Sequence, residues 1–315
     1  MVASAYVSRL AEPNQSLKSH RALSRPARDN PAYHHFIHTL PMLAADLFSF
    51  ALRVRERSPL VHCLTNLVVT NFTANVLLAL GAAPAMVIAR EEVGEFVPLA
   101  NAVSVNLGTL DLPQSKAIRA AVEAANRAHK PWVLDPVAVG PLSFRTAFAF
   151  DLLDAHPAVI RGNASEIISL SGGESSARGV DSTTFAEAAL DAAQVLALNT
   201  GAVVAVTGPT DYVTDGRRTV ALSNGSPLMT RVTGVGCALS ATVAAFVGVA
   251  DSEDRWAATL AAVAYSSIAG ELASRDAALP GSFAVAYLDR LASLDANLFA
   301  ATLVSRDVAS GASRA

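Results

Sequence analysis

The stretch Trp132-Val133-Leu134-Asp135-Pro136 carries the pattern on which the fold prediction rests. Its apolar residues run without the alternation of a half-exposed strand, and it lies between two Ala-rich amphipathic stretches at residues 113–129 and 144–155. A fully buried strand between two helices is typical of a parallel sheet that is covered on both faces.

The same alternation continues along most of the chain. The other strand-like runs are residues 85–89, 102–107, 158–161, 202–207, 211–214 and 218–222. Further helix-like stretches are residues 70–80, 91–100, 182–198, 236–249 and 254–275. No stretch between residues 60 and 295 has the composition of a domain linker. The sequence therefore predicts one α/β domain with a mostly parallel central sheet and helices on both faces.

The composition narrows the function classes. The chain has 315 residues, of which 52% are hydrophobic and 16% charged, which excludes disorder over most of its length. Lys and Arg number 24 against 27 for Asp and Glu, so the chain lacks the basic surplus that favours nucleic acid. The mean hydropathy is +0.36, yet no unbroken apolar run is long enough to cross a membrane. We expect neither nucleic acid nor a membrane as partner.

The ends of the chain differ from its middle. Residues 1–41 are rich in Ser, Pro and Asn, carry a mild basic surplus and hold four of the seven histidines. We expect a dispensable extension there, with Met42 as an alternative start, although an organellar transit peptide has a similar composition. The folded domain is expected over residues 42–300, with a flexible tail at 301–315. Cys63 and Cys237 lie far apart and favour a reducing, cytoplasmic compartment.

The stretch Thr233-Gly234-Val235-Gly236-Cys237 precedes a predicted helix. Free backbone N–H groups and the helix dipole bind anions at such a position, and the glycines allow a phosphate to come close. The Lys of a Walker loop is missing. We expect the helix end to favour the thiolate of Cys237. The alternative is an ordinary turn followed by an inert, buried cysteine.

Several other segments occur in a recognisable order with this loop. They are Leu64-Thr65-Asn66, Val69 to Asn75, Leu80-Gly81-Ala82 with Pro84 and Met86, Glu91-Glu92-Val93, Asn106 to Leu110, Leu134 to Val137, Phe144-Arg145-Thr146, Arg161-Gly162-Asn163 with Glu166, and Val206-Thr207-Gly208 followed by Asp211. Together they resemble the motifs of hydroxyethylthiazole kinases, members of the ribokinase-like superfamily, over roughly residues 58–295.

The resemblance implies an enzyme that phosphorylates the alcohol of 4-methyl-5-(2-hydroxyethyl)thiazole with Mg²⁺ and ATP, in thiamine biosynthesis and salvage. It also implies a fold without a separate lid domain and a homotrimer with active sites between subunits. Three alternatives remain open: a ribokinase-like ATP-dependent dehydratase, a kinase of a related heterocyclic alcohol, and a nucleotide-binding regulator. The dehydratases carry an aspartate where this chain has Cys237.

By the same resemblance, each site residue receives a role. Cys237 is the catalytic candidate. The residues expected to bind the thiazole are Met86, Gly234, Asn66 and Asn71, and those expected to bind ATP are Arg145, Thr207, Gly236, Val235 and Asn163. The residues expected to hold Mg²⁺ are Asp135 and Glu166. Each also has a structural interpretation. The methionine suits core packing, the asparagines suit helix caps, and the glutamate suits the first turn of a helix.

Four positions depart from the family pattern. Relatives commonly have Asp-Pro-Val-Gly-Ala-Gly where this chain places Ala138 and Val139 before Gly140. Cys63 stands where Asn is usual, and Val235 where Thr or a smaller residue is common. These larger or less polar side chains are expected to change the shape of the pocket and therefore the preferred alcohol.

Overall fold

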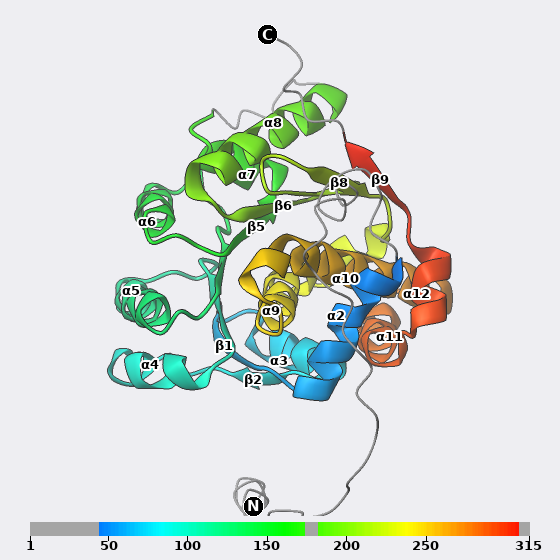
Figure 1. Cartoon of the computed structure of the whole chain (residues 1–315), viewed down its shortest axis with the longest axis horizontal. Helices are drawn as coiled ribbons and strands as arrows, with labels where there is room; N and C mark the ends of the chain where they lie inside the picture. The colour runs from blue at the N-terminus through cyan, green and yellow to red at the C-terminus, as the bar shows by residue number, and fades with distance from the viewer. Residues whose placement is uncertain (1–43, 174–181, 309–315) are drawn as a thin grey trace, which may run out of the picture. The chain divides into compact units, whose positions relative to one another are not determined.

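The computed structural model describes residues 44–173 and 182–308, which form one sheet with helices on both sides (Figure 1). The strands are β1 (Leu60–Leu64), β2 (Ala83–Ala85), β3 (Ala102–Asn106), β4 (Trp132–Asp135), β5 (Val159–Asn163), β6 (Val203–Thr207), β7 (Asp211–Thr214), β8 (Thr219–Leu222) and β9 (Ser305–Val308). The helices are α2 (Ala44–Arg57), α3 (Thr70–Leu80), α4 (Arg90–Phe96), α5 (Leu112–Arg127), α6 (Ser143–Leu153), α7 (Ala164–Leu170), α8 (Ser182–Thr200), α9 (Val235–Val247), α10 (Arg255–Asp276), α11 (Pro280–Ser293) and α12 (Ala296–Thr302), with short 3-10 helices η2 (Val97–Leu99), η3 (Pro227–Arg231) and η4 (Ser252–Asp254).

The order of the strands is β2-β1-β3-β4-β5-β6-β7-β8-β9. Strands β1 to β6 run parallel to one another, whereas β7, β8 and β9 each pair antiparallel with the strand before them in this order. The parallel strands all end at the same edge of the sheet. Ligands of open α/β sheets bind beyond that edge, so it is the place to look for a site.

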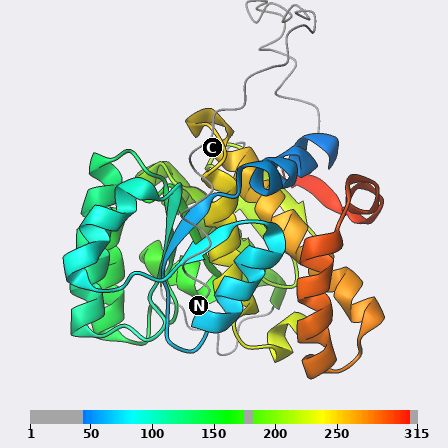
Figure 2. The same cartoon turned by 90° about the horizontal axis from the view of Figure 1, so that it is seen from below.

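The helices divide between the two faces of the sheet. Figure 2 shows α4 to α6 on one side, in cyan to green, and α9 to α11 on the other, in yellow to orange. Two apolar clusters reflect this division, one including residues of α5 and α8 and the other residues of α9 and α10. All five residues of β3 are buried, as expected for a strand between two layers of helix. The predicted fold class is therefore confirmed.

Local sequence explains where several helices begin and end. Helix α3 ends at Gly81, whose φ of 90° is a left-handed conformation that glycine adopts without steric cost. Helix α5 begins after Asp111, whose side chain accepts a hydrogen bond from the backbone N–H of Gln114 at 2.7 Å. These signals keep the predicted helices within a few residues of the observed ones.

The expected boundaries need two corrections. Strand β2 covers Ala83–Ala85 rather than residues 85–89, so Met86 follows the strand directly. Strand β9 pairs with β8 inside the segment that was expected to be a flexible tail, so the fold extends beyond residue 300. The extension expected at residues 1–41 lies outside the described residues. Helices α2, α7, α11 and α12 and strands β1 and β9 were not predicted.

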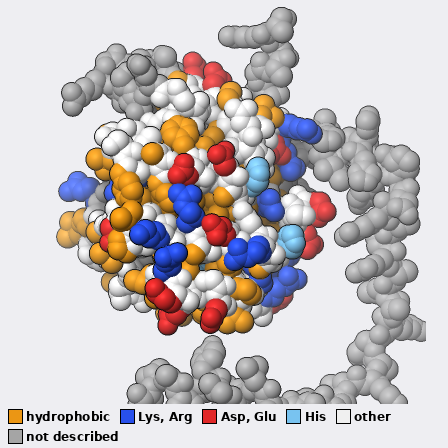
Figure 3. Space-filling model, turned by 90° about the vertical axis from the view of Figure 1, so that its left-hand side faces the viewer, with side chains coloured by type: hydrophobic (Ala, Val, Ile, Leu, Met, Phe, Trp, Pro, Cys, Tyr) orange, Lys and Arg blue, Asp and Glu red, His pale blue; other side chains and the backbone are white. Residues whose placement is uncertain are grey.

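Surface charge is mixed on the side of the molecule that faces left in Figure 1. Figure 3 shows basic and acidic side chains interspersed with apolar ones on this face. This mixture of positive and negative side chains agrees with the small net charge of the chain, −3. Among the described residues, no helix has both the length and the apolar character that crossing a membrane requires.

Candidate functional site

Polar side chains gather where the parallel strands end. Asn66 follows β1, Asn106 and Asp135 are the last residues of β3 and β4, and Thr207 is the last residue of β6. Asn66, Asn106 and Asp135 are buried, with 4%, 1% and 1% of their surface exposed. Because buried polar groups need partners, these residues are expected to bond to one another.

The loop before α9 faces this cluster. Gly234 is the N-cap of α9 with a φ of 95°, and a Cβ there would lie 3.1 Å from Phe72 and Val69. The first helical hydrogen bond runs from Ala238 N to Gly234 O at 2.8 Å. The N–H groups of residues 235–237 therefore have no acceptor within the helix and are available to an anion. The anion-binding geometry expected from the sequence is present.

Cys237 lies in the first turn of α9 and is half-buried. Its Sγ accepts a hydrogen bond from Asn66 Nδ2 at 3.4 Å, and the same Nδ2 donates to Asn106 Oδ1 at 2.9 Å. Burial raises the pKa of the Cys237 thiol, and the nearby charge of Asp135 raises it further. Both effects oppose the thiolate that the sequence analysis expected from the helix end.

Asp135 lies at the centre of the buried network. Its Oδ2 accepts hydrogen bonds from Asn106 Nδ2 at 2.6 Å and Ser240 Oγ at 2.8 Å, and lies 3.8 Å from Arg161 Nη1. Burial nevertheless raises the pKa of this carboxyl to about 7. Its Oδ1 is buried and accepts no hydrogen bond from the described residues. Such an oxygen is available to a cation or to a water molecule that a cation holds.

Glu166 and Asn163 form a capping box at the start of α7. Asn163 Oδ1 accepts from Glu166 N at 2.9 Å, and Glu166 Oε2 accepts from Asn163 N at 2.8 Å. Glu166 Oε1 also accepts from Ala138 N at 3.0 Å. Glu166 thus has the helix-start position of its structural interpretation. Asn163 is exposed and its side chain serves the cap.

Ala138 has a φ of 58°, in the left-handed region that glycine favours. The backbone at Ala138 is therefore strained, and Glu166 holds it through the bond to Ala138 N. The turn that follows Asp135 is thereby tied to the start of α7.

Two arginines lie near the ends of the parallel strands, Arg145, which was expected to bind ATP, and Arg161. Arg145 Nη1 donates to Val137 O at 3.1 Å and does not line either of the two cavities described below. Arg161 Nη2 donates to Thr207 Oγ1 at 2.6 Å, and its Nη1 donates to Gly236 O at 3.0 Å. The sequence analysis quoted Arg161 in a motif without giving it a role. Its place directly before the Gly162-Asn163 end of a parallel strand was the signal that could have identified it.

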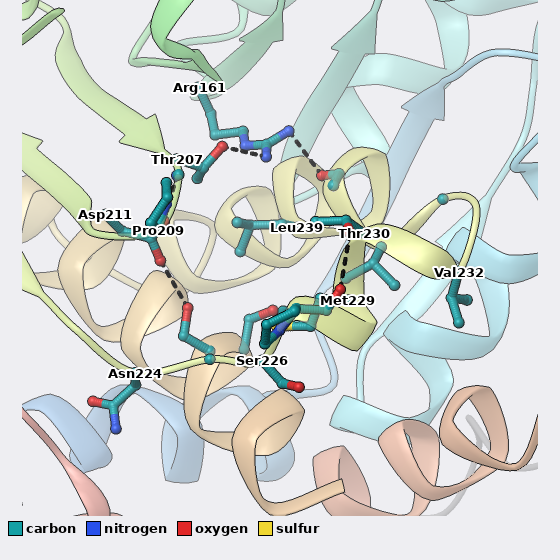
Figure 4. A pocket seen from close by; sticks show the side chains of 18 of the residues that line it. Arg161, Thr207, Pro209, Asp211, Asn224, Ser226, Met229, Thr230, Val232 and Leu239 are labelled. Carbon is teal, nitrogen blue, oxygen red and sulfur yellow. Dashed lines mark hydrogen bonds between the residues drawn. The ribbon is translucent and has the colours of Figure 1, made fainter. Parts of the chain in front are cut away.

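The Thr207 cavity has a volume of about 750 Å³, within the range of small-molecule sites. One end is polar: Arg161, Thr207 and residues 234–236 line it. Figure 4 shows the bonded Arg161 and Thr207 on one side, with Met229 and Ser226 away from them on the other. The cavity therefore offers a cation and backbone N–H groups at one end, and at the other the thioether of Met229 among polar side chains such as Ser226.

The Met86 cavity is a second hollow of about 750 Å³. Met86, Thr65 and Gln114 line it, and Gln114 Nε2 donates to Thr65 O at 3.1 Å. Asn71 is not part of either cavity lining: it is exposed on α3, and its Oδ1 accepts from Asn75 Nδ2 at 3.0 Å. Of the expected thiazole contacts, the structure brings Asn66 to Cys237 and places Met86 in this cavity.

A family model described as "Hydroxyethylthiazole kinase family" matches residues 52–297. The chain is 55% identical to a hydroxyethylthiazole kinase of Tolumonas auensis over 251 residues, which are 80% of this chain and 94% of that protein. It is 42% identical to a hydroxyethylthiazole kinase from Pyrococcus horikoshii OT3 of known structure, with a TM-score of 0.77 over 84% of this chain and 99% of the other.

A protein of lower sequence identity also has a similar structure. A pyridoxal kinase from Staphylococcus aureus is 17% identical, with a TM-score of 0.50 over 68% of this chain and 88% of the other. At that identity the match supports the ribokinase-like fold alone.

Proposed function

Because the chain belongs to the hydroxyethylthiazole kinase family, we propose that its two cavities hold the two substrates of that reaction, ATP in the Thr207 cavity and the alcohol towards the Met86 cavity. The enzyme transfers a phosphoryl group from ATP to the hydroxyethyl group of 4-methyl-5-(2-hydroxyethyl)thiazole, giving the thiazole phosphate and ADP, in thiamine salvage. The observation that carries the proposal is the Arg161 guanidinium, which bonds to both Thr207 and Gly236.

The phosphate end of the Thr207 cavity supports ATP binding. Arg161 supplies a cation, and the N–H groups at the start of α9 supply donors that are already aimed at an anion. Thr207, Val235 and Gly236 belong to this end, as the family resemblance implies. Arg145 and Asn163 would act on it only through the Val137 turn and the start of α7. Phosphoryl transfer depends chiefly on such positioning and charge neutralisation.

The residues present fit a divalent metal ion. Asp135 Oδ1 is a buried carboxylate oxygen that accepts no hydrogen bond from the described residues. Both oxygens of Glu166 already accept backbone N–H groups, so we propose that Asp135 holds Mg²⁺ and that Glu166 acts on it through water. Bound Mg²⁺ supplies neutralising charge for the phosphate oxygens. Ser240 and Asn106 hold Asp135 in place by donating to its other oxygen.

Cys237 is proposed to lie at the transferred phosphoryl group, beside the free N–H groups of its own helix. During transfer the acceptor oxygen attacks the γ-phosphorus, the bond to the bridging oxygen breaks and the hydroxyl proton is released. Asn66 orients the sulfur by donating to it. The Cys237 thiolate is proposed to accept that proton, and a weak contribution from this base suffices because charge neutralisation dominates the reaction. Gly234 and Met86 are proposed to border the thiazole ring.

We further propose a homotrimer with active sites between subunits. Apolar side chains are exposed around the Met86 cavity: Leu67 is 77% exposed, Ile88 56% and Leu112 58%. A second copy of the chain would cover such residues and close the acceptor site. A monomer in a sedimentation experiment would contradict this assembly. A cytoplasmic location is proposed from the two free thiols, Cys63 and Cys237.

A direct assay tests the function. Purified enzyme is given ATP and Mg²⁺ with the thiazole alcohol, and in parallel with hydroxymethylpyrimidine, with pyridoxal and with no alcohol. We expect the thiazole phosphate to form faster than any other product. Phosphorylation of none of the alcohols above the ATPase background would contradict the function, and preference for another alcohol would move the proposal to a related substrate.

A further inference from the structure

The far wall of the Thr207 cavity is built by η3, which follows β8 in the chain. Ser226 caps η3, its Oγ accepting from Leu228 N at 3.3 Å, and Thr230 Oγ1 donates to Pro227 O at 2.8 Å. Met229 lies in this short helix, lines the cavity and also packs against the core on the α9 and α10 side of the sheet. The wall is therefore held both by its own turn and by contact with the body of the protein.

Met229 occupies a gap in α10 that exists because residue 270 is glycine. A Cβ built on Gly270 would lie 2.9 Å from Met229 Cγ and 3.0 Å from its Cε, and closer still to its Sδ. Real Cβ atoms essentially never come that close to another heavy atom. The whole end of the methionine side chain thus lies against the backbone of α10, at a distance that only glycine permits.

The position of this wall relative to the phosphate end limits what it can contact. Arg161 and Thr207 lie at one end of the cavity, and Met229 presents its apolar side chain at the other, beside Ser226 (Figure 4). A molecule with phosphates at the first end would place a flat, mostly apolar group at the second. A thioether packs well on aromatic rings.

We infer that Met229, seated against Gly270, is a specificity-determining residue for the nucleotide: it forms the wall on which the base of ATP packs. The inference rests on the proposed placement of ATP in the Thr207 cavity. It assigns to Gly270, which does not line the cavity, the role of a positioning residue that sets how far the wall stands from the base.

The experiment is a double-mutant cycle of Gly270→Ala and Met229→Ala with KM for ATP and KM for the thiazole alcohol as readouts. In the wild-type background, Gly270→Ala pushes Met229 towards the cavity, so we expect KM for ATP to rise roughly tenfold, within the usual cost of overpacking. In the Met229→Ala background the three atoms nearest to the new Cβ are absent, and KM for ATP is expected to stay constant. KM for the alcohol is expected to stay constant throughout.

Two controls separate this role from a general effect on folding. Gly281→Ala is the matched substitution, because Gly281 lies in α11 and a Cβ there would have no heavy atom within 4 Å. It is expected to leave both KM values unchanged. Met229→Ala is expected to lower the preference for ATP over CTP, measured as the ratio of their kcat/KM values, because a purine packs over more of the wall than a pyrimidine.

Three results would overturn the inference. Gly270→Ala could raise KM for ATP equally in both backgrounds, or it could leave KM for ATP unchanged in the wild-type background. Met229→Ala could leave the ratio of kcat/KM for ATP to kcat/KM for CTP unchanged. Failure of the proposed function is distinguishable, since the wild type would then phosphorylate no thiazole alcohol. In that case ATP affinity, measured by isothermal titration calorimetry on the same variants, tests the wall directly.

Discussion

Arg161 and Thr207 are joined by a hydrogen bond of 2.6 Å between Nη2 and Oγ1, across neighbouring strands β5 and β6. The same guanidinium donates to Gly236 O in the anion-binding loop, and only 11% of its side chain is exposed. One side chain thereby connects a strand end, the start of α9 and the vicinity of Asp135. A planar, forked donor is suited to such a position, and a lysine is not.

Replacement of Arg161 tests this connection. We expect Arg161→Met to lower kcat/KM for ATP by about 100-fold or more, because the phosphate end loses its buried cation. Arg161→Lys keeps the charge but cannot reach both acceptors, so an intermediate loss is expected. Arg119→Lys is the control, since Arg119 forms an exposed ion pair with Asp151. Equal activity of wild type and Arg161→Met would exclude a role in nucleotide binding.

Substitution of Cys237 tests its catalytic role. Cys237→Asp is expected to keep activity, because an aspartate stands at this position in many ribokinase-like relatives, and Cys237→Ala is expected to lower kcat by roughly tenfold to 100-fold. KM for ATP should change little, since the N–H groups of the loop remain. Steady-state kinetics with both substrates separates these effects. If Cys237→Ala turns over as fast as the wild type, the sulfur has no part in the reaction.

Because the pKa of Asp135 is raised, we expect the stability of the folded protein to depend on pH. The folded protein holds the proton of this carboxyl up to about pH 7, well above its value of 3.8 in an unfolded chain. This contribution to stability is therefore complete below pH 4 and is lost as the pH rises to 7. Asp135→Asn cannot ionise, so its melting temperature relative to wild type should increase over that range in buffer without nucleotide or divalent metal. A difference that is independent of pH would contradict the prediction.

The strained turn at Ala138 can be relieved. Ala138→Gly removes a side chain from a left-handed conformation that costs about 1–2 kcal/mol, while glycine adds about 0.5–1 kcal/mol of unfolded-state entropy. We expect unchanged to slightly higher stability in denaturant unfolding. Ala277→Gly is the control, because Ala277 has an ordinary extended φ of −147° and should lose stability. A loss at Ala138 equal to that at Ala277 would show that the turn is not strained.

Much of the fold could be predicted because its signals are local. The run at Trp132 to Asp135, the glycine at position 81 and the Asp111-Leu112-Pro113 start of α5 each act within a few residues. Strand β9 was missed because Ser305–Val308 has no apolar pattern: it is the edge strand, largely exposed, and only pairing with β8 makes it a strand. Asn71 was expected at the thiazole end; the structure has it exposed on α3 with its Oδ1 bonded to Asn75, and its neighbours in sequence do not reveal which side of α3 it takes.

The sequence by itself determined the alternation of strands and helices, the glycine loop at the start of α9 and the family. Only the tertiary structure decided that Arg161 reaches the anion loop, that burial and Asp135 raise the pKa of the Cys237 thiol, and that Gly270 makes room for Met229. The physical reason is distance along the chain. Periodicity and capping depend on residues a few positions apart, whereas a pKa, a guanidinium contact or a packing gap depends on groups that distant segments bring together.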